Sequence, residues 1–199
     1  MSRYPVPLPG DHDPIAGPHD VNLRPIVADD IEQFMRWLQE EEVAYWWDEA
    51  DSSLEEIRAD YFEADVNPCW RFIIVWQGRD VGLFQYYHDY ADTEYSFSAG
   101  IDIFIGEADA RDRGVGREAI RVLLCHLFEV KHLHRVTIDP EVGNTRAIRS
   151  YEAAGFKRDG VSRHNYFMRG EYVDTQYLSI LETEWPEAKA RWLEARAAR

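Results

Sequence analysis

Apolar positions in the N-terminal third of the chain change from a strand period to a helical one. Residues 21–26, VNLRPI, predict a first strand, and residues 28–39 predict an amphipathic helix. Asp29 and Asp30 are candidate N-caps for this helix. Its apolar face is made of Ile31, Phe34, Met35 and Leu38.

A second helix is predicted to begin at Ser53. Glu56 follows three residues later, and this spacing is the capping box that marks a helix start. The segment between the two helices, residues 43–52, is rich in aromatic and acidic side chains and is predicted to be a linker. One face of the second helix carries Leu54, Ile57 and Tyr61.

The middle of the chain predicts three strands, a glycine-containing loop, a helix and a fourth strand. Residues 70–90 hold two apolar runs around Gln77–Asp80 and predict a β-hairpin, and residues 96–106 predict a long strand. After the loop and its helix, residues 134–139 predict a short strand. Strand, helix and strand in this order imply a parallel pair joined by a crossover. The apolar stripe of the helix consists of Ile120, Leu123, Leu124, Leu127 and Phe128.

The C-terminal part predicts a helix, a hairpin and a final helix. Residues 145–154 lie between Asn144 and Gly155, which suit the start and the left-handed end of a helix. Residues 165–181 predict a second β-hairpin, and Pro186 is placed to begin a surface helix.

A chain of 199 residues with 45% hydrophobic residues has the size and composition of one globular domain. We expect this domain to cover residues 21–182, with a flexible proline-rich leader before it (1–20) and a C-terminal helix after it (183–199). The leader lacks the apolar region of a signal peptide, and no apolar run reaches the roughly 20 residues that span a bilayer. We therefore expect a cytoplasmic protein in which Cys69 and Cys125 are reduced thiols.

The formal net charge of −15 narrows the classes of partner. Phosphates are repelled by such a chain, so the charge disfavours nucleic acid and anionic membranes as partners. It suits a cationic small-molecule substrate, although acidity also serves solubility alone. His126, His132 and His134 lie near Cys125 in the sequence, but their spacing matches no zinc signature, so no metal is expected.

Residues 110–120, ARDRGVGREAI, raise the question of which anion the chain binds. Two glycines precede a helix, and the first N–H groups and the dipole of a helix favour an anion such as phosphate. Gly114, Gly116 and Ala119 match a weak dinucleotide-binding pattern, but that pattern turns directly out of the first strand of a domain and this loop does not. A Walker loop is excluded because no Gly-Lys-Ser/Thr follows.

The pattern Arg111-x-x-Gly114-x-Gly116 resembles the coenzyme A pyrophosphate loop of the GNAT acyltransferase superfamily. The more specific signal is NTRAIRSYEAAGF, and the order of elements over residues 22–182 also fits. Within the superfamily the chain resembles aminoglycoside 6'-N-acetyltransferases. The segments that carry this closer resemblance are EEVAYWWDE, GID in the central strand and IDPEVGNTRAIRSYEAAGF. The leader and the C-terminal helix are not part of the shared pattern.

The resemblance implies an α+β GNAT fold, a mixed twisted β-sheet flanked by helices, with a V-shaped splay between the central strands. It also implies acetyl-CoA as cosubstrate, no metal, and acetyl transfer to the 6'-amine of an aminoglycoside, which would confer antibiotic resistance. A monomer or a homodimer is expected. The cofactor-binding residues that the resemblance implies are Ile103, Phe104, Ile105, Arg111, Arg113, Gly114, Val115, Gly116, Arg117, Asn144, Ala147 and Tyr151.

Each group of cofactor-binding residues has an implied role. The backbone of residues 103–105 runs beside the pantetheine arm and polarises the thioester carbonyl, and the amides of residues 113–117 hold the pyrophosphate. Arg111 and Arg113 add charge to this loop, unless they are only solvated loop residues.

Tyr151 is the implied acid for the leaving thiolate. It follows Asn144 by seven residues, or two helical turns, so both side chains share one helix face. A tyrosine on an apolar face is otherwise a core residue, and the surrounding NTRAIRSYEAAGF motif favours the functional role.

Asp102 is the most informative of the candidate catalytic residues. It lies inside the apolar strand GIDIFIG, on the face opposite Ile101, Ile103 and Ile105. A carboxylate there is costly unless it is paired or used. The resemblance implies that it meets the acceptor amine as the base, yet a carboxylate beside an ammonium stabilises the ammonium. Asp102 is therefore either a true base or a group that orients the amine and passes its proton to water.

The other substrate-binding candidates are acidic or aromatic. Asp139 ends a strand at its carboxyl end, where open α/β sheets bind ligands, or else it caps the turn before Pro140. Trp46 and Trp47 cannot easily share one core face, and the acids beside them suit a cationic, ring-shaped ligand. Weaker candidates, taken from their position in the resembled pattern, are Tyr61, Gln85 and Asp174.

Two other functions stay open at the level of sequence. A siderophore-pathway N-acyltransferase acting on N6-hydroxylysine shares much of the pattern, but a histidine is expected there in place of Asp102. The other is a non-catalytic module that retains coenzyme A. The presence of both Asp102 and Tyr151 argues against this second alternative.

Overall fold

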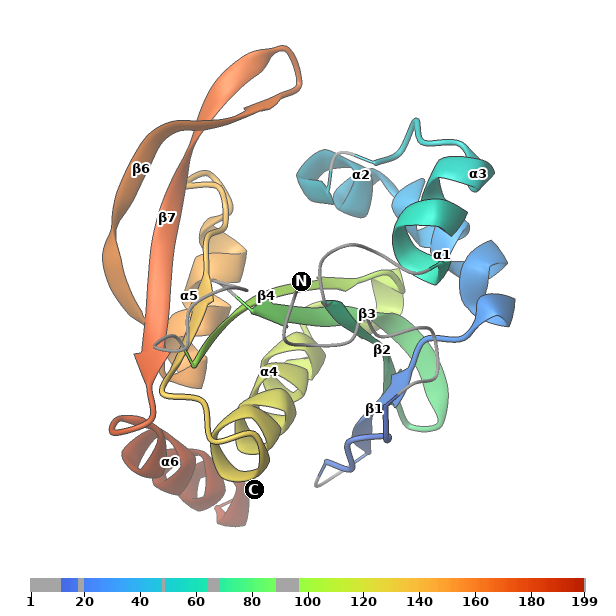
Figure 1. Ribbon diagram of the computed structural model, residues 1–199. Coiled ribbons are helices and arrows are strands. Elements are labelled where there is room, and N and C mark those ends of the chain that lie inside the picture. Colours follow the sequence, from blue (N-terminus) through green and yellow to red (C-terminus); the bar gives the residue numbers. More distant parts are fainter. Residues whose placement is uncertain (1–11, 18–19, 48, 64–68, 89–96, 199) are drawn as a thin grey trace.

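The computed structural model describes residues 12–17, 20–47, 49–63, 69–88 and 97–198. Within this part of the chain, seven strands form one mixed sheet in the order β1-β2-β3-β4-β5-β7-β6 (Figure 1). All neighbouring strands are antiparallel except β4 and β5. The predicted mixed sheet flanked by helices is thus confirmed. The strands are β1 (Val21–Pro25), β2 (Cys69–Trp76), β3 (Arg79–His88), β4 (Ser98–Ile105), β5 (Arg135–Ile138), β6 (Lys157–Met168) and β7 (Glu171–Leu181).

The parallel strands β4 and β5 stay paired over only a short stretch. Their register runs from Ser98 opposite Arg135 to Gly100 opposite Thr137. β4 continues to Ile105, paired there with β3 alone. The two central strands therefore separate toward their carboxyl ends, which is the predicted V-shaped splay and the place where sheets of this kind bind ligands.

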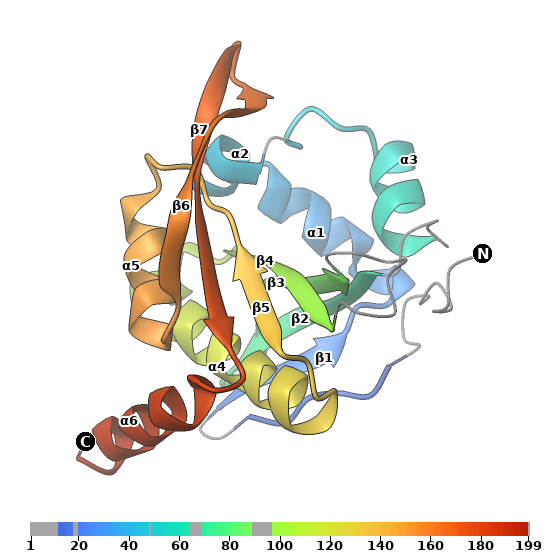
Figure 2. The same ribbon diagram turned by 60° about the vertical axis from the view of Figure 1, so that its left-hand side comes forward.

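Helices cover both faces of the sheet (Figures 1 and 2). The first three helices lie on one face, and α4 crosses the other with its predicted apolar stripe buried. None of the helices described combines the length and the apolar composition that crossing a membrane requires. The helices are α1 (Ile31–Leu38), α2 (Glu41–Trp47), α3 (Leu54–Ile57), α4 (Val115–Cys125), α5 (Thr145–Ala154) and α6 (Trp185–Ala197).

Two rows of side chains cross β2, β3 and β4 on the face that α1 covers. One row is apolar and consists of Ile73, Leu83 and Phe104. The next row, two residues along each strand, is polar and consists of Arg71, Gln85 and Asp102. Because side chains alternate along a strand, both rows lie on the same face, and the helices α1 to α3 bury only the apolar one.

The sequence predicts a linker at residues 43–52, but residues 43–47 belong to the helix α2. α2 extends to Trp47, and Glu41 and Glu42 lie in its first turn, where carboxylates interact favourably with the helix dipole. Val43 alone among its residues is buried. Trp47, one helical turn later, also packs against the core, but a single pair at helical spacing is too short a pattern to predict a helix.

The terminal segments pack against the domain. Ile15, in the leader expected at residues 1–20, exchanges two backbone hydrogen bonds with Leu23 of β1, at 2.7 and 3.0 Å. At the other end, Trp192 of α6 is buried and donates a hydrogen bond to Glu118 of α4 at 2.9 Å. Outside the described residues lie 1–11 and 18–19 of the leader, residue 48 of the predicted linker, and the strand ends expected at 89–90 and 96.

Candidate active site

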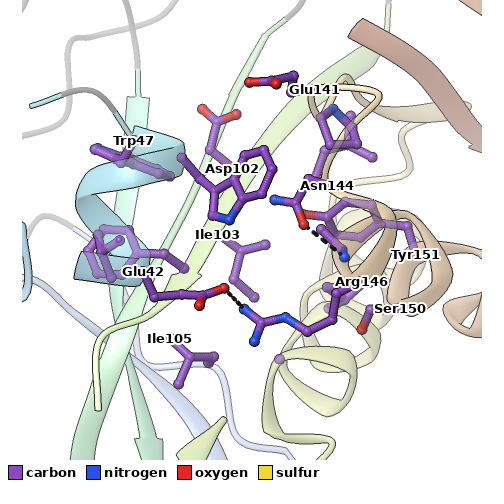
Figure 3. Close-up of a pocket in the computed structure, with 18 of the residues that line it drawn as sticks. Glu42, Trp47, Asp102, Ile103, Ile105, Glu141, Asn144, Arg146, Ser150 and Tyr151 are labelled. Atoms are coloured by element: carbon purple, nitrogen blue, oxygen red, sulfur yellow. Dashed lines mark hydrogen bonds and ion pairs between the residues drawn. The ribbon is translucent and has the colours of Figure 1, made fainter. Parts of the chain in front are cut away.

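A pocket of about 870 Å³ opens where β4 and β5 separate. One wall comes from α2, the turn after α3 and β4, and the opposite wall comes from the start of α4, the loop after β5 and α5 (Figure 3). Every predicted site residue lines this pocket except Arg113 and Asp174. The structure therefore brings the other predicted site residues together around one cavity.

Asp102 extends into the pocket from β4 (Figure 3). Its Oδ2 accepts a hydrogen bond from Gln85 Nε2 at 2.9 Å. Gln85 Oε1 in turn accepts from Arg71 Nε at 3.2 Å and from the Cys69 thiol at 3.6 Å. The carboxylate in this otherwise apolar strand is therefore partnered, which offsets the cost of its partial burial.

A half-buried carboxylate, Glu49, supports the aromatic wall of the pocket. Its Oε2 accepts hydrogen bonds from the Tyr61 hydroxyl at 2.7 Å and from Trp47 Nε1 at 3.1 Å. Burial raises the pKa of Glu49, against the lowering effect of these two donors. Burial, and then the charge of Glu49, raise the pKa of Tyr61 above its usual range. Tyr61 thus stays a hydrogen-bond donor, and both rings are held by polar contacts as well as by packing.

The glycine loop enters α4 through left-handed backbone. Gly114 has a φ of +80°, a conformation that glycine adopts without strain. The Glu118 N–H donates to the Gly114 carbonyl at 3.0 Å, so the N–H groups of residues 115–117 precede the helical hydrogen bonds. At Gly116 an added Cβ would lie 3.7 Å from its nearest neighbour, in Ile105. A side chain at position 116 would therefore cause no clash within the protein. The N–H groups at the start of α4 are of the kind that bind anions.

The arginines of this loop differ from expectation. Arg111 donates to the carbonyl oxygens of Ile105 at 2.9 Å and Gly106 at 2.7 Å, so its guanidinium ties the end of β4 to the loop. Arg113 is exposed and lies outside the pocket. Arg117 lines the pocket, and its Nε is buried without a hydrogen-bond partner in the part of the chain that the structure describes. Arg117 is therefore better placed than Arg111 or Arg113 to contact an anionic ligand.

α5 brings its first turn and Tyr151 to the pocket (Figure 3). Asn144 caps the helix, with its Oδ1 accepting from the Ala147 N–H at 3.1 Å. Tyr151 is 7% exposed. Burial raises the pKa of Tyr151 above its usual range, and the negative charges of Asp102 and Asp139 act in the same direction. The phenol is therefore held in its protonated form.

Asp139 and Asp174 lie in different places, although both are predicted to bind substrate. Asp139 lines the pocket, and its Oδ2 accepts a hydrogen bond from the Tyr166 hydroxyl at 2.9 Å. Asp174 accepts from the backbone N–H of His164 at 2.8 Å. Both neighbours of Asp174 on β7 line the pocket, so the alternation of the strand turns Asp174 away from it. Contrary to the prediction, Asp174 is not part of the pocket.

Two arginines make contacts across the pocket, and we call these the cross-pocket contacts. Glu42 of α2 and Arg146 of α5 form an ion pair of 2.6 Å (Figure 3). Arg169, at the turn between β6 and β7, pairs with Glu141 and donates to the Tyr45 carbonyl of α2 at 2.7 Å. Sequence reasoning missed these residues because they are far apart along the chain and no local pattern relates them.

The arrangement suits transfer of a group between an anionic ligand and a cationic one. The start of α4 and Arg117 suit the anion, whereas Asp102, Glu49 and Asp139 suit the cation. Tyr151 is influenced by the charges of two of these carboxylates and can donate a proton. Among the described residues no group of histidines, cysteines and carboxylates is arranged to hold a metal ion.

Known proteins share this architecture. The family described as acetyltransferase (GNAT) domain matches residues 27–163. Aminoglycoside N(6')-acetyltransferase type 1 of Klebsiella pneumoniae is 28% identical over 154 residues, which cover 70% of this chain and 75% of that protein. Spermidine N(1)-acetyltransferase of Vibrio cholerae is 25% identical over 150 residues, which cover 72% of this chain and 82% of that protein.

A solved structure extends the comparison to three dimensions. The aminoglycoside acetyltransferase AAC(6')-Ib, in complex with coenzyme A and kanamycin, superposes with a TM-score of 0.72 at 24% identity. The superposition covers 85% of this chain and 99% of that one. The two chains therefore share their fold.

Proposed function

The chain belongs to the GNAT acetyltransferase family, and on this premise we propose that it transfers the acetyl group of acetyl-CoA to the 6'-amine of an aminoglycoside. The observation that carries the proposal is one pocket that holds both the anion-binding start of α4 and the carboxylate of Asp102. Similarity to the K. pneumoniae enzyme supports this choice of acceptor. The net charge of −15 also favours a polycationic substrate.

The start of α4 fits the pyrophosphate of coenzyme A. The N–H groups of residues 115–117 would hold that group, and Arg117, with its unpartnered Nε among the described residues, would add positive charge. The backbone of Ile103 to Ile105 would run beside the pantetheine arm, opposite Asn144 and Ala147. When bound, acetyl-CoA supplies the acetyl thioester.

Gly116→Ala is expected to weaken coenzyme A binding without destabilising the fold. The added Cβ meets only ordinary contacts, so the free energy of unfolding should change by less than about 0.5 kcal/mol. The methyl group would extend toward the side chains of Ile103 and Ile105, beside the expected path of coenzyme A, so the Kd for coenzyme A should rise by about tenfold. Calorimetric titration and thermal unfolding measure the two effects separately.

Gly114→Ala is the matched control for this prediction. Its positive φ makes a side chain unfavourable by about 1–2 kcal/mol, so this variant should lose stability as well as affinity. Wild-type affinity for coenzyme A in Gly116→Ala would place the pyrophosphate elsewhere than at this loop.

The acceptor half of the pocket combines carboxylates with aromatic rings. Asp102, Asp139 and Glu49 suit ammonium groups, and Trp46 and Trp47 offer faces to a cationic ring-shaped ligand. Of these, Asp102 is the group nearest in the chain to the backbone expected to lie beside the pantetheine arm. We therefore assign the reacting amine to Asp102 and the other ammonium groups to the remaining carboxylates.

Acetyl transfer to an amine needs a neutral nitrogen and a proton for the departing sulfur. Asp102 orients the nitrogen and takes up its proton or passes it to water as the new N–C bond forms. Tyr151 keeps its proton because burial and nearby carboxylates raise its pKa, so it can donate that proton to the sulfur. A backbone N–H of β4 polarises the carbonyl of the acetyl group.

Linear polyamines are a second class of acceptor. Similarity to spermidine N(1)-acetyltransferase of V. cholerae favours this class, and the same carboxylates suit both kinds of polycation. The two proposals differ in the acceptor but share the site and the chemistry.

The experiment that tests the proposal is thiol release from acetyl-CoA with neomycin, paromomycin and spermidine as parallel acceptors. Neomycin carries a 6'-amine where paromomycin carries a 6'-hydroxyl. Turnover with neomycin alone would establish the reaction and its position, and equal turnover with both antibiotics would assign another amine. Turnover with spermidine alone would support the polyamine alternative. If none of the three acceptors gives thiol release, N6-hydroxylysine is the next acceptor to test. No turnover with that amine either would favour a binding module that retains coenzyme A without catalysis.

A further inference from the structure

Arg71, Gln85 and Asp102 form a connected row across three neighbouring strands. Arg71 is opposite Gln85 in the register of β2 and β3, and Gln85 is opposite Asp102 in that of β3 and β4. Hydrogen bonds join the row from end to end, at 3.2 Å between Arg71 Nε and Gln85 Oε1 and at 2.9 Å between Gln85 Nε2 and Asp102 Oδ2. Continuous backbone pairing of the three strands fixes the spacing of these side chains.

The chemistry of the row allows one orientation of the Gln85 amide. A guanidinium can only donate hydrogen bonds, and an ionised carboxylate can only accept them. If the amide rotated by half a turn, its NH₂ group would meet Arg71 and its carbonyl would meet Asp102, so both hydrogen bonds would be lost. The Cys69 thiol also approaches Gln85 Oε1, at 3.6 Å, but a thiol is a weak donor. Arg71 therefore determines which end of the amide faces Asp102.

Arg71 is itself held from the side of α3. Its guanidinium carbon lies 4.9 Å from the centre of the Tyr61 ring, a cation–π distance. The Tyr61 hydroxyl donates to Glu49 at 2.7 Å. Arg71 is thus linked through neutral side chains to two pocket carboxylates, Asp102 on one side and Glu49 on the other, while it does not itself line the pocket.

We propose that Arg71 is a positioning residue for acetyl transfer, acting through Gln85 to keep an N–H donor on the Asp102 carboxylate. This inference rests on the proposed function, in which Asp102 receives the acceptor amine. The donor fixes the plane of the carboxylate, so the amine meets it in one orientation. It also favours the ionised form, so the carboxylate meets the amine as an anion.

The experiment compares Arg71→Met, Gln85→Leu and the double variant, with Arg158→Met, an exposed arginine of β6, as control. Two quantities are measured: the titration of the Asp102 carboxyl by carbon-13 NMR, assigned with Asp102→Asn, and the pH profile of kcat/KM with the amine that the wild type acetylates best. In each single variant, the titration of Asp102 should move to higher pH by about one unit, and the acidic limb of the kcat/KM profile should move with it. At a given pH on that limb, kcat/KM should therefore be about tenfold lower than in the wild type. The double variant should equal Gln85→Leu alone.

Three results would overturn the inference. An unchanged titration in Arg71→Met would show that Arg71 does not act on Asp102. Additive shifts in the double variant would mean that Arg71 acts by its charge through space and not through Gln85. A shifted titration with an unchanged kcat/KM profile would remove any role in acetyl transfer.

Two further measurements keep the test decisive. Thermal unfolding checks each variant, and Arg71→Gln replaces Arg71→Met if that variant does not fold. The glutamine amide can accept as well as donate a hydrogen bond, so it does not fix the orientation of Gln85. This variant should then reproduce the upward shift in the Asp102 titration, and a wild-type titration would overturn the inference. A wild type that acetylates no amine would count against the proposed function, while the NMR titration would still decide the contact between Arg71 and Asp102.

Discussion

Asp102→Asn is expected to lower kcat/KM for acetyl transfer by roughly 10²- to 10⁴-fold, the range of a group that handles a proton in the reaction. Asparagine keeps the shape of the side chain, but it carries no charge and cannot take up the proton of the amine. The Kd for coenzyme A should stay at the wild-type value, because the groups that suit the pyrophosphate lie at the start of α4. Thiol release measures the first quantity, and calorimetry measures the second.

The pH profile of this variant distinguishes the two roles open to Asp102. If Asp102 only removes a proton, activity should recover at high pH, where the amine is neutral in solution. If Asp102 orients the amine, activity should stay low at every pH. Asp159→Asn, a surface aspartate paired with Arg135, serves as control. A near-normal rate in Asp102→Asn would exclude both roles.

Tyr151→Phe is expected to lower kcat by about 10²-fold, at the lower end of the effect of a general acid. The phenyl ring keeps the packing of Tyr151 against Phe156, so the loss should reflect the hydroxyl alone. Burial and the carboxylates raise the pKa of Tyr151, so the wild-type phenol stays protonated up to at least the ordinary tyrosine value of about 10. The deficit of the variant should therefore be constant from about pH 6 to pH 9.

The control for this prediction is Tyr172→Phe, at an exposed tyrosine near the β6–β7 turn. A kcat for Tyr151→Phe within twofold of wild type would assign the sulfur proton to water and Tyr151 to the core. A deficit that grows toward high pH would show instead that another group ionises in this range. Steady-state rates across the pH series measure all three outcomes.

Periodic and local signals were sufficient for most of the framework. α5 begins and ends where predicted, because Asn144 caps its first turn and Gly155, with a φ of +118°, ends it. The capping box of Ser53 and Glu56 is formed at the start of α3. Each of these features depends on residues close together in the chain, so the sequence contains the whole signal.

α2 could not be predicted in the same way, because its aromatic side chains serve the pocket. Trp46 and Trp47 both line the cavity, and only Val43 is buried in the core. The apolar stripe of this helix is limited to Val43 and Trp47, one turn apart, so the segment resembles a linker in the sequence.

Most residues predicted for the site line one pocket, but their hydrogen-bond partners could not be predicted from the sequence. Motifs indicated that Arg111 and Arg117 lie near the glycine loop, yet only tertiary structure shows that Arg111 binds carbonyls of β4 and that Arg117 lines the pocket with a buried Nε. In the same way, the register of three strands brings Arg71 to Gln85 and Asp102. A one-residue shift in that register would turn these side chains to the opposite face.

The cross-pocket contacts add to the effect that dissolved salt has on an acidic protein. Glu42 and Arg146 are 41% and 52% exposed, so mobile ions screen their attraction and loosen the bridge between α2 and α5. Bound molecules are then expected to leave the pocket more easily. The same ions weaken the long-range attraction between an acidic chain and a polycation. Both effects are expected to lower the occupancy of the pocket by a polycation as ionic strength rises.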